Sequence, residues 1–179
     1  MFIKDLDSKT EVEQLIAIKR DGYNIRHIQN PSERIQLAAI RLSGLFIQHI
    51  KNPTDKVQLA AVKNYGWSIR YIKNPSERAQ LVAVKSYWNA IGYIKNPSER
   101  VQLAAVKKNG YSIAYIKRPS ERVQLAAVID YGRSIRYIKN PSEQIQLAAI
   151  KKDIDSIKHI QNPCKAVRDY VLVHNIMTE

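Results

Sequence analysis

The sequence predicts an all-α fold, an α-solenoid built from tandem 22-residue repeats. The phrase NPSERVQLAAV recurs with small changes at a fixed spacing, and its copies open at Asn30, Asn52, Asn74, Asn96, Arg118, Asn140 and Asn162. A period of this length is typical of repeats that bury their apolar faces by stacking on one another. Each copy also carries helix-start residues, followed by an apolar stretch free of helix breakers.

Each repeat, numbered 1 to 22 from its first residue, predicts a helix of about three turns and a very short second helix. We read Asn at position 1, Pro at 2 and Glu at 4 as N-cap, first helical residue and capping-box partner. Gly at 15 suits a left-handed residue that ends this helix, and Ser at 17 can cap the next one. The isoleucines at 18 and 21 are expected core residues. A strand over the last seven positions, as in leucine-rich horseshoes, is the alternative, but the leucine and asparagine spacing of those repeats is missing.

We expect one solenoid domain over residues 1–179, with an N-terminal capping repeat at 1–29, six regular repeats at 30–161 and a C-terminal cap helix at 162–179. In the first repeat Lys9 replaces the proline and Glu13 replaces an apolar residue. Polar substitutions of this kind are typical of capping repeats. The single cysteine, Cys164, excludes an internal disulfide and a cysteine-based zinc site.

The segment NPSERVQLAAVKKNGYSIAYIK, residues 96–117, resembles helical repeats found in tandem in bacterial and phage proteins of unknown function. It is also similar to the leucine-rich repeat variant and to HEAT-like α-solenoids. The resemblance covers nearly the whole chain. It implies a right-handed superhelix in which a long helix alternates with a short 3₁₀-like helix, and it brings no catalytic residues. A phage origin is associated with this resemblance.

The chain carries a net charge of +13, which favours contact with polyanions. Positions 5, 12, 19 and 22 hold 20 of the 29 cations, so the excess charge follows the repeat. Positions 5 and 12 fall within about 20° of each other on the helix and form one basic stripe. The candidate partner-binding residues of this stripe are Arg34, Lys56, Arg78, Arg100, Arg122, Arg41, Lys63, Lys85 and Lys107. The alternative is a solvated face on which Glu at 4 pairs across repeats with Arg at 5, in exposed pairs that contribute little.

Aromatic and amide positions form a second group of candidates. Position 20 is always His or Tyr, either to stack on a ligand or, in the interpretation we favour, to cover the apolar seam beside the isoleucines. Gln at 7 is expected to bond loop carbonyls or the next glutamine. The sequence varies around positions 13 to 16, where specific contacts with a partner are expected, although local packing explains the same residues. The aromatic candidates there are Tyr65, Trp67, Tyr87, Trp88, Tyr111 and Tyr131.

These patterns predict a non-catalytic binding module for an extended anionic partner, with DNA or RNA backbone ahead of an acidic protein surface. The first alternative is a protein–protein interaction scaffold, such as a phage or mobile-element inhibitor that docks on a host defence protein; the second is a site for a small anion or nucleotide. An enzyme of the helical-repeat DNA glycosylase kind would rely on Trp88 and Asp130. We expect no catalytic residue, metal or cofactor, a monomer rather than an obligate oligomer, no membrane span and a cytoplasmic location.

Overall fold

The computed structural model describes residues 5–176, and α-helices alternate there with 3₁₀ helices. The α-helices are α1 (Glu11–Arg20), α2 (Glu33–Leu42), α3 (Asp55–Asn64), α4 (Glu77–Ser86), α5 (Glu99–Lys108), α6 (Glu121–Asp130), α7 (Glu143–Lys152) and α8 (Lys165–Ile176). The 3₁₀ helices are η1 (Gly22–His27), η2 (Gly44–His49), η3 (Gly66–Tyr71), η4 (Trp88–Tyr93), η5 (Gly110–Tyr115), η6 (Gly132–Tyr137) and η7 (Ile154–His159). No strand occurs between residues 5 and 176. The all-helical prediction is confirmed, and the strand alternative is wrong.

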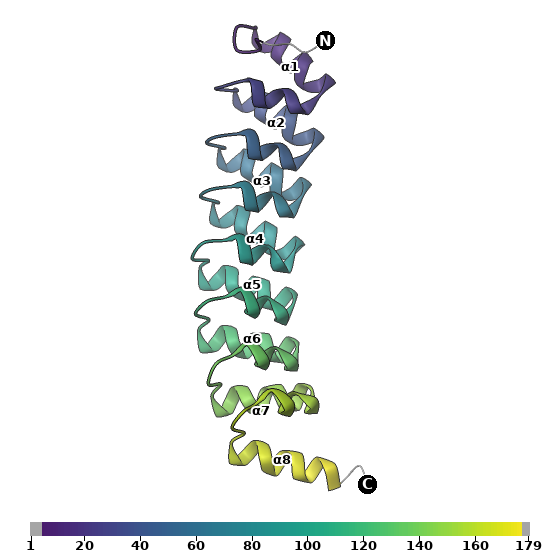
Figure 1. Ribbon diagram of the computed structural model, residues 1–179, viewed down its shortest axis with the longest axis vertical. Coiled ribbons are helices and arrows are strands. Elements are labelled where there is room, and N and C mark those ends of the chain that lie inside the picture. The colour runs from purple at the N-terminus through teal and green to yellow at the C-terminus, as the bar shows by residue number, and fades with distance from the viewer. Residues whose placement is uncertain (1–4, 177–179) are drawn as a thin grey trace. The chain divides into compact units, whose positions relative to one another are not determined.

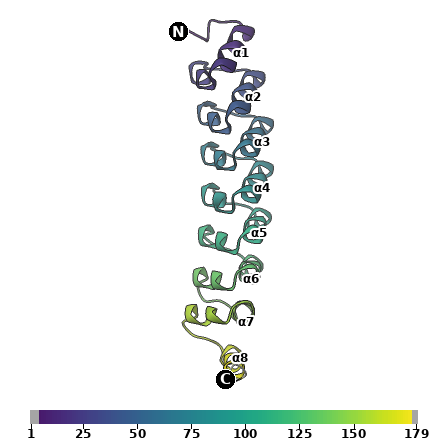
Figure 2. The same ribbon diagram turned by 90° about the vertical axis from the view of Figure 1, so that its right-hand side faces the viewer.

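The chain forms two compact units, residues 1–96 and 97–179. The first contains α1 to α4 with their 3₁₀ helices, and the second contains α5 to α8 with theirs (Figure 1). Within each unit the α-helices stack in one layer and the 3₁₀ helices in another, as the turned view shows (Figure 2). Within a unit, each helix packs on its counterpart in the next repeat, for example α2 on α3 and η2 on η3. This sequential packing is that of an α-solenoid, whereas the handedness of the superhelix and the division into capping and regular repeats stay predictions.

The core lies between the two layers and repeats with the sequence. Position-18 isoleucines from Ile25 to Ile135 are at most 2% exposed, and those at position 21 are at most 9% exposed. Alanine at position 10 and Ile or Val at position 11 are also buried from α1 to α7. The burial of one such isoleucine contributes about 1.5–3 kcal/mol. The isoleucine prediction is thus confirmed, except that Ile157 at position 18 is only half-buried.

The cap prediction is wrong by two residues. Each regular α-helix begins at position 4, and the N-cap is Ser or Thr at position 3; the Ser32 hydroxyl, for instance, accepts from the N–H of Ile35 at 3.4 Å. Proline at position 2 lies outside the helix because glutamine at position 7 bonds its carbonyl. The Gln36 Nε2 donates to Pro31 O at 2.8 Å, and five further repeats make the same bond. The predicted bond to loop carbonyls is confirmed.

Position 15 differs from the prediction, because no glycine in residues 5–176 has a positive φ. The α-helix ends instead on an extended residue at position 14, such as Ser43 with φ −158°. Glycine follows because the next repeat comes close. A Cβ on Gly44 would lie 2.5 Å from Ala61 O, and one on Gly110 would lie 2.4 Å from Ala127 O.

The serines at position 17 do not cap the 3₁₀ helices. They are completely buried inside them, and the Ser112 hydroxyl donates to Ala105 O at 3.0 Å. The caps are at position 14, where Asp21, Ser43, Asn109 and Asp153 accept from the N–H two residues on. Ser112 therefore ties η5 to α5, whereas the buried hydroxyls of Ser68, Ser134 and Ser156 have no hydrogen-bond partner among the described residues.

Candidate anion-binding surface

The position-5 cations pair with acids of the preceding repeat. Arg34 lies 3.8 Å from Glu11, Lys56 lies 2.9 Å from Glu33, Arg78 lies 3.3 Å from Asp55, and Arg122 lies 3.8 Å from Glu99. The same acids accept hydrogen bonds from the next N-cap, as Glu33 does from the Thr54 hydroxyl at 2.7 Å. The bond from Lys56, with that from Thr54, holds the pKa of Glu33 below its usual value. The alternative in which position 4 pairs across repeats is thus confirmed at these junctions.

The position-12 cations lie in the last turn of the α-helices, where positive charge also complements the helix dipole. All are exposed, and in residues 5–176 none of them has an ion pair. They include the candidates Arg41, Lys63, Lys85 and Lys107, together with Lys19 and Lys151. In α6 the exposed Ile129 interrupts this row.

The position-22 lysines form the second row of unpaired cations. They lie in the loops that lead from each 3₁₀ helix to the next α-helix, and all are exposed. Within the described part of the chain no carboxylate pairs with them. The row consists of Lys51, Lys73, Lys95, Lys117 and Lys139.

The arginines at position 19 lie against aromatic rings, including those of the tyrosines at position 20. The Arg70 guanidinium lies 5.8 Å from the Trp67 ring, 5.2 Å from Tyr71 and 5.4 Å from Tyr93, distances typical of cation–π contacts. Arg136 lies 5.0 Å from the Tyr137 ring in the same way. The position-20 tyrosines keep 38–50% of their surface exposed. In the first unit the equivalent His49 is half-buried; burial, with the positive charge of Arg26, lowers its pKa.

The variable aromatic residues mostly pack on aromatic residues of the next repeat. Ring centroids lie 5.9 Å apart for Tyr65 and Tyr87, and 5.5 Å apart for Trp67 and Tyr93. Tyr23 and Phe46, which the sequence did not single out, make the same kind of contact at 4.9 Å. These contacts give the residues a packing role, while their contact with a partner stays a prediction. Trp88 is half-buried at the start of η4.

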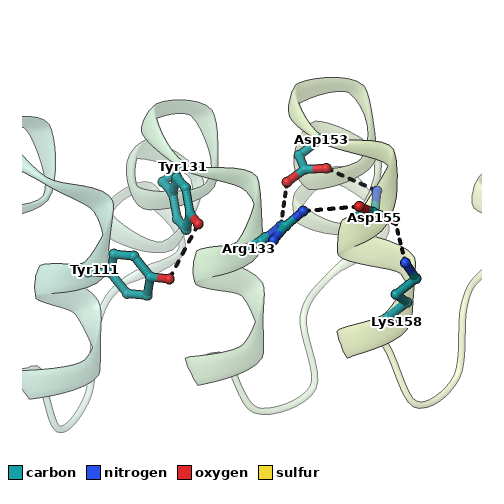
Figure 3. A network of polar contacts seen from close by, with 6 residues as sticks. All are labelled: Tyr111, Tyr131, Arg133, Asp153, Asp155 and Lys158. Atoms are coloured by element: carbon teal, nitrogen blue, oxygen red, sulfur yellow. Dashed lines mark hydrogen bonds and ion pairs between the residues drawn. The ribbon is translucent and has the colours of Figure 1, made fainter.

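A polar network in the second unit was also missed from the sequence (Figure 3). The Tyr111 hydroxyl donates to that of Tyr131 at 3.3 Å, and this bond raises the pKa of Tyr131. The Arg133 guanidinium donates to Asp153 at 2.7 Å and to Asp155 at 3.0 Å, and Asp153 raises its pKa.

Lys158 completes this network with a bond to Asp155 at 2.6 Å, which lowers the pKa of that carboxyl. The only signal in the sequence is that Arg133 and Asp153 fall at neighbouring variable positions of adjacent repeats. The network neutralises Arg133 and Lys158 locally.

Two further observations bound the chemistry of the described part of the chain. No helix between residues 5 and 176 has the length and apolar character to cross a membrane. Over the same residues, no three His, Cys, Asp or Glu side chains gather closely enough to hold a metal ion. Compared with protein-family models, with curated proteins and with solved structures, the chain gives no match.

Proposed function

We propose that this protein is a non-catalytic module that binds an extended polyanion, with the nucleic-acid backbone as its partner. The observation that supports the proposal is the contrast between rows of cations. The position-5 cations Arg34, Lys56 and Arg78 are paired, whereas the position-12 and position-22 rows are exposed and unpaired within residues 5–176. The excess charge is therefore concentrated in two rows that follow the repeat.

The spacing of these rows suits a chain of phosphates. Packed helices lie about 8–10 Å apart, so cations one repeat apart within a unit are separated by roughly one such distance. The screening length at 0.1 M salt is also about 10 Å, so neighbouring cations reinforce one another. Lysines on such a row neutralise phosphates and release counterions without reading bases. The exposed tyrosines at position 20 offer ring faces on which the bases of a single strand can stack.

The test is a salt titration of binding to labelled single-stranded DNA, duplex DNA and single-stranded RNA by fluorescence anisotropy. For single strands we expect the logarithm of the binding constant to fall with a slope of about −0.7 per phosphate neutralised. A triple variant of the first unit, Lys51→Gln, Lys73→Gln and Lys95→Gln, removes three position-22 lysines. Its slope should be shallower by about 2.

The matched control is Arg34→Gln, Lys56→Gln and Arg78→Gln, which removes the same charge from the paired row of the same unit. We expect its slope to stay close to that of the parent protein. An equal effect of both triple variants would show that net charge alone drives binding and would refute the proposed row. Binding that is absent, or insensitive to salt, would refute a nucleic-acid partner and favour the protein-interaction alternative.

A further inference from the structure

A pocket of 550 Å³ opens in the second unit beside the loop that joins η6 to α7. Three basic side chains from adjacent repeats line it: Arg136 on η6, Lys139 in the loop and His159 at the end of η7. Asn140 and Asn162 add amide groups, and no carboxylate lies in the lining. The volume falls within the range of about 300–1,000 Å³ that is typical of small-molecule sites.

Two of the basic side chains in this pocket have no acidic partner in residues 5–176. Within the part of the chain that the structure describes, neither Arg136 nor Lys139 has a hydrogen bond or an ion pair. Asp155, four residues before His159 on η7, is bonded to Lys158 and Arg133, and His159 contributes only a smaller electrostatic effect to the lowering of the Asp155 pKa. The Tyr137 ring, 5.0 Å from the Arg136 guanidinium, supports that side chain at the pocket wall. An anion is therefore the ligand that these side chains suit.

The backbone around the pocket is fixed by its own bonds. Gln146 is 8% exposed; its Nε2 donates to Pro141 O at 3.1 Å, and its Oε1 accepts from the N–H of Cys164 at 2.9 Å. Asn140 has φ 50°, a left-handed conformation that asparagine tolerates better than most residues. The loop that carries Lys139 is thus held on both sides, and the pocket is formed without a ligand.

This combination of residues occurs at one junction only. We compare three positions at each junction: 19 and 22 of one repeat and 20 of the next. They are Arg, Lys and His at one junction only, that of Arg136, Lys139 and His159. The nearest equivalent is Arg70, Lys73 and Tyr93, where tyrosine replaces histidine and its ring lies 5.4 Å from the Arg70 guanidinium. Elsewhere position 19 is Gln48, Gly92 or Ala114, or position 22 is not lysine. A basic row that only binds an extended polyanion would not need a different set of residues at this one junction.

We propose that Arg136, Lys139 and His159 bind a phosphate group, with Asn140 and Asn162 as neutral donors. A guanidinium offers paired N–H donors that match two phosphate oxygens, the ammonium adds charge, and the imidazole offers a further hydrogen bond. The volume accommodates a phosphomonoester of nucleotide size. This proposal does not depend on the extended polyanion, because a single phosphate occupies the site.

The test is an NMR titration of the full chain, labelled with ¹⁵N, with inorganic phosphate, adenosine 5′-monophosphate, adenosine and a dinucleotide that has only an internal phosphodiester. We expect inorganic phosphate and the monophosphate to shift the amide signals of residues 138–140 and 159–162, and adenosine to leave them in place. The dinucleotide separates the sources: comparable shifts assign the site to backbone phosphates, and much weaker shifts assign it to phosphomonoesters.

Two variants in exposed positions of the second unit give the matched comparison. Lys139→Gln should weaken phosphate binding at least tenfold, whereas Lys117→Gln removes the same charge from the same row one repeat away and should weaken it far less. His159→Tyr, which reproduces the Arg70 junction, should also weaken binding at least tenfold. The proposal is overturned if no phosphate compound shifts these signals at millimolar concentration, or if Lys117→Gln weakens binding as much as Lys139→Gln. The polyanion test is separate, because the Lys51, Lys73 and Lys95 variant changes only the first unit. Loss of its salt-dependent binding would not alter the phosphate titration of the second unit.

Discussion

Gly44→Ala tests the close approach between neighbouring repeats. The added Cβ would lie 2.5 Å from the carbonyl oxygen of Ala61 and 2.9 Å from the Ser68 hydroxyl, both below the 3.0 Å that real Cβ atoms do not undercut. The carbonyl belongs to α3, so relief of the clash requires η2 and α3 to separate. Overpacking of this kind costs about 1–3 kcal/mol, and the stiffer unfolded chain returns about 0.4–1 kcal/mol. We expect a net loss of about 1–2 kcal/mol.

Urea unfolding followed by tryptophan fluorescence measures this loss, because both tryptophans, Trp67 and Trp88, lie in the same unit as Gly44. Gly66→Ala is the matched control. Its Cβ meets the Tyr87 ring at 2.5 Å, and that side chain is 38% exposed and can turn toward solvent. A Gly44→Ala protein as stable as the parent, or as stable as Gly66→Ala, would refute the explanation of glycine at position 15.

Three further predictions concern single repeats. Ile69→Ala removes a completely buried side chain and should lower the free energy of unfolding by about 2–5 kcal/mol. Tyr71→Ala, at a residue 39% exposed whose ring contacts Arg70, should lower it by only about 1 kcal/mol; equal losses in urea unfolding would contradict this. Lys56→Met should raise the pKa of Glu33 toward its usual value in an NMR titration. Because the pKa of Glu33 is depressed in the folded protein, this carboxylate stabilises the fold above the usual carboxyl pKa. That stabilisation is lost as pH falls through the pKa of the folded protein. Ser120→Ala should cost about 0.5–2 kcal/mol, because its hydroxyl caps α6 and also bonds Glu99, and Ser142→Ala should cost less because that hydroxyl bonds Glu121 without capping α7.

The period and the buried columns could be predicted from the sequence, because recurrence inside one chain shows which positions are constrained. The isoleucines at position 18 and the glutamines at position 7 were interpreted correctly on this basis, down to the bond with a loop carbonyl. The alternative explanation of positions 4 and 5 as a pair across repeats was also available from their charges. These features depend on residue type and period alone.

The errors come from side-chain and packing contacts, within a repeat and between repeats, that local helix rules do not contain. Asn30 and Ser32 are both good N-caps, and the bond from Gln36 to Pro31 decides for the serine by holding the proline outside the helix. Glycine at 15 is explained by the neighbouring carbonyl rather than by its own φ. The pocket around Arg136 was missed because its three basic residues belong to three different positions of the repeat, and only the layered packing brings them together.

The hydroxyl and carboxylate bonds between repeats have a consequence for how the array can change in length. The Thr54 hydroxyl bonds Glu33, and the Ser76 hydroxyl bonds Asp55. Loss of residues 52–73 by unequal recombination would set Ser76 against Glu33 and restore the same bond. Genetic gain or loss of whole repeats therefore preserves the junctions of the first unit, whereas the Arg136, Lys139 and His159 junction exists in one copy, and loss of either repeat that contributes to it would abolish it.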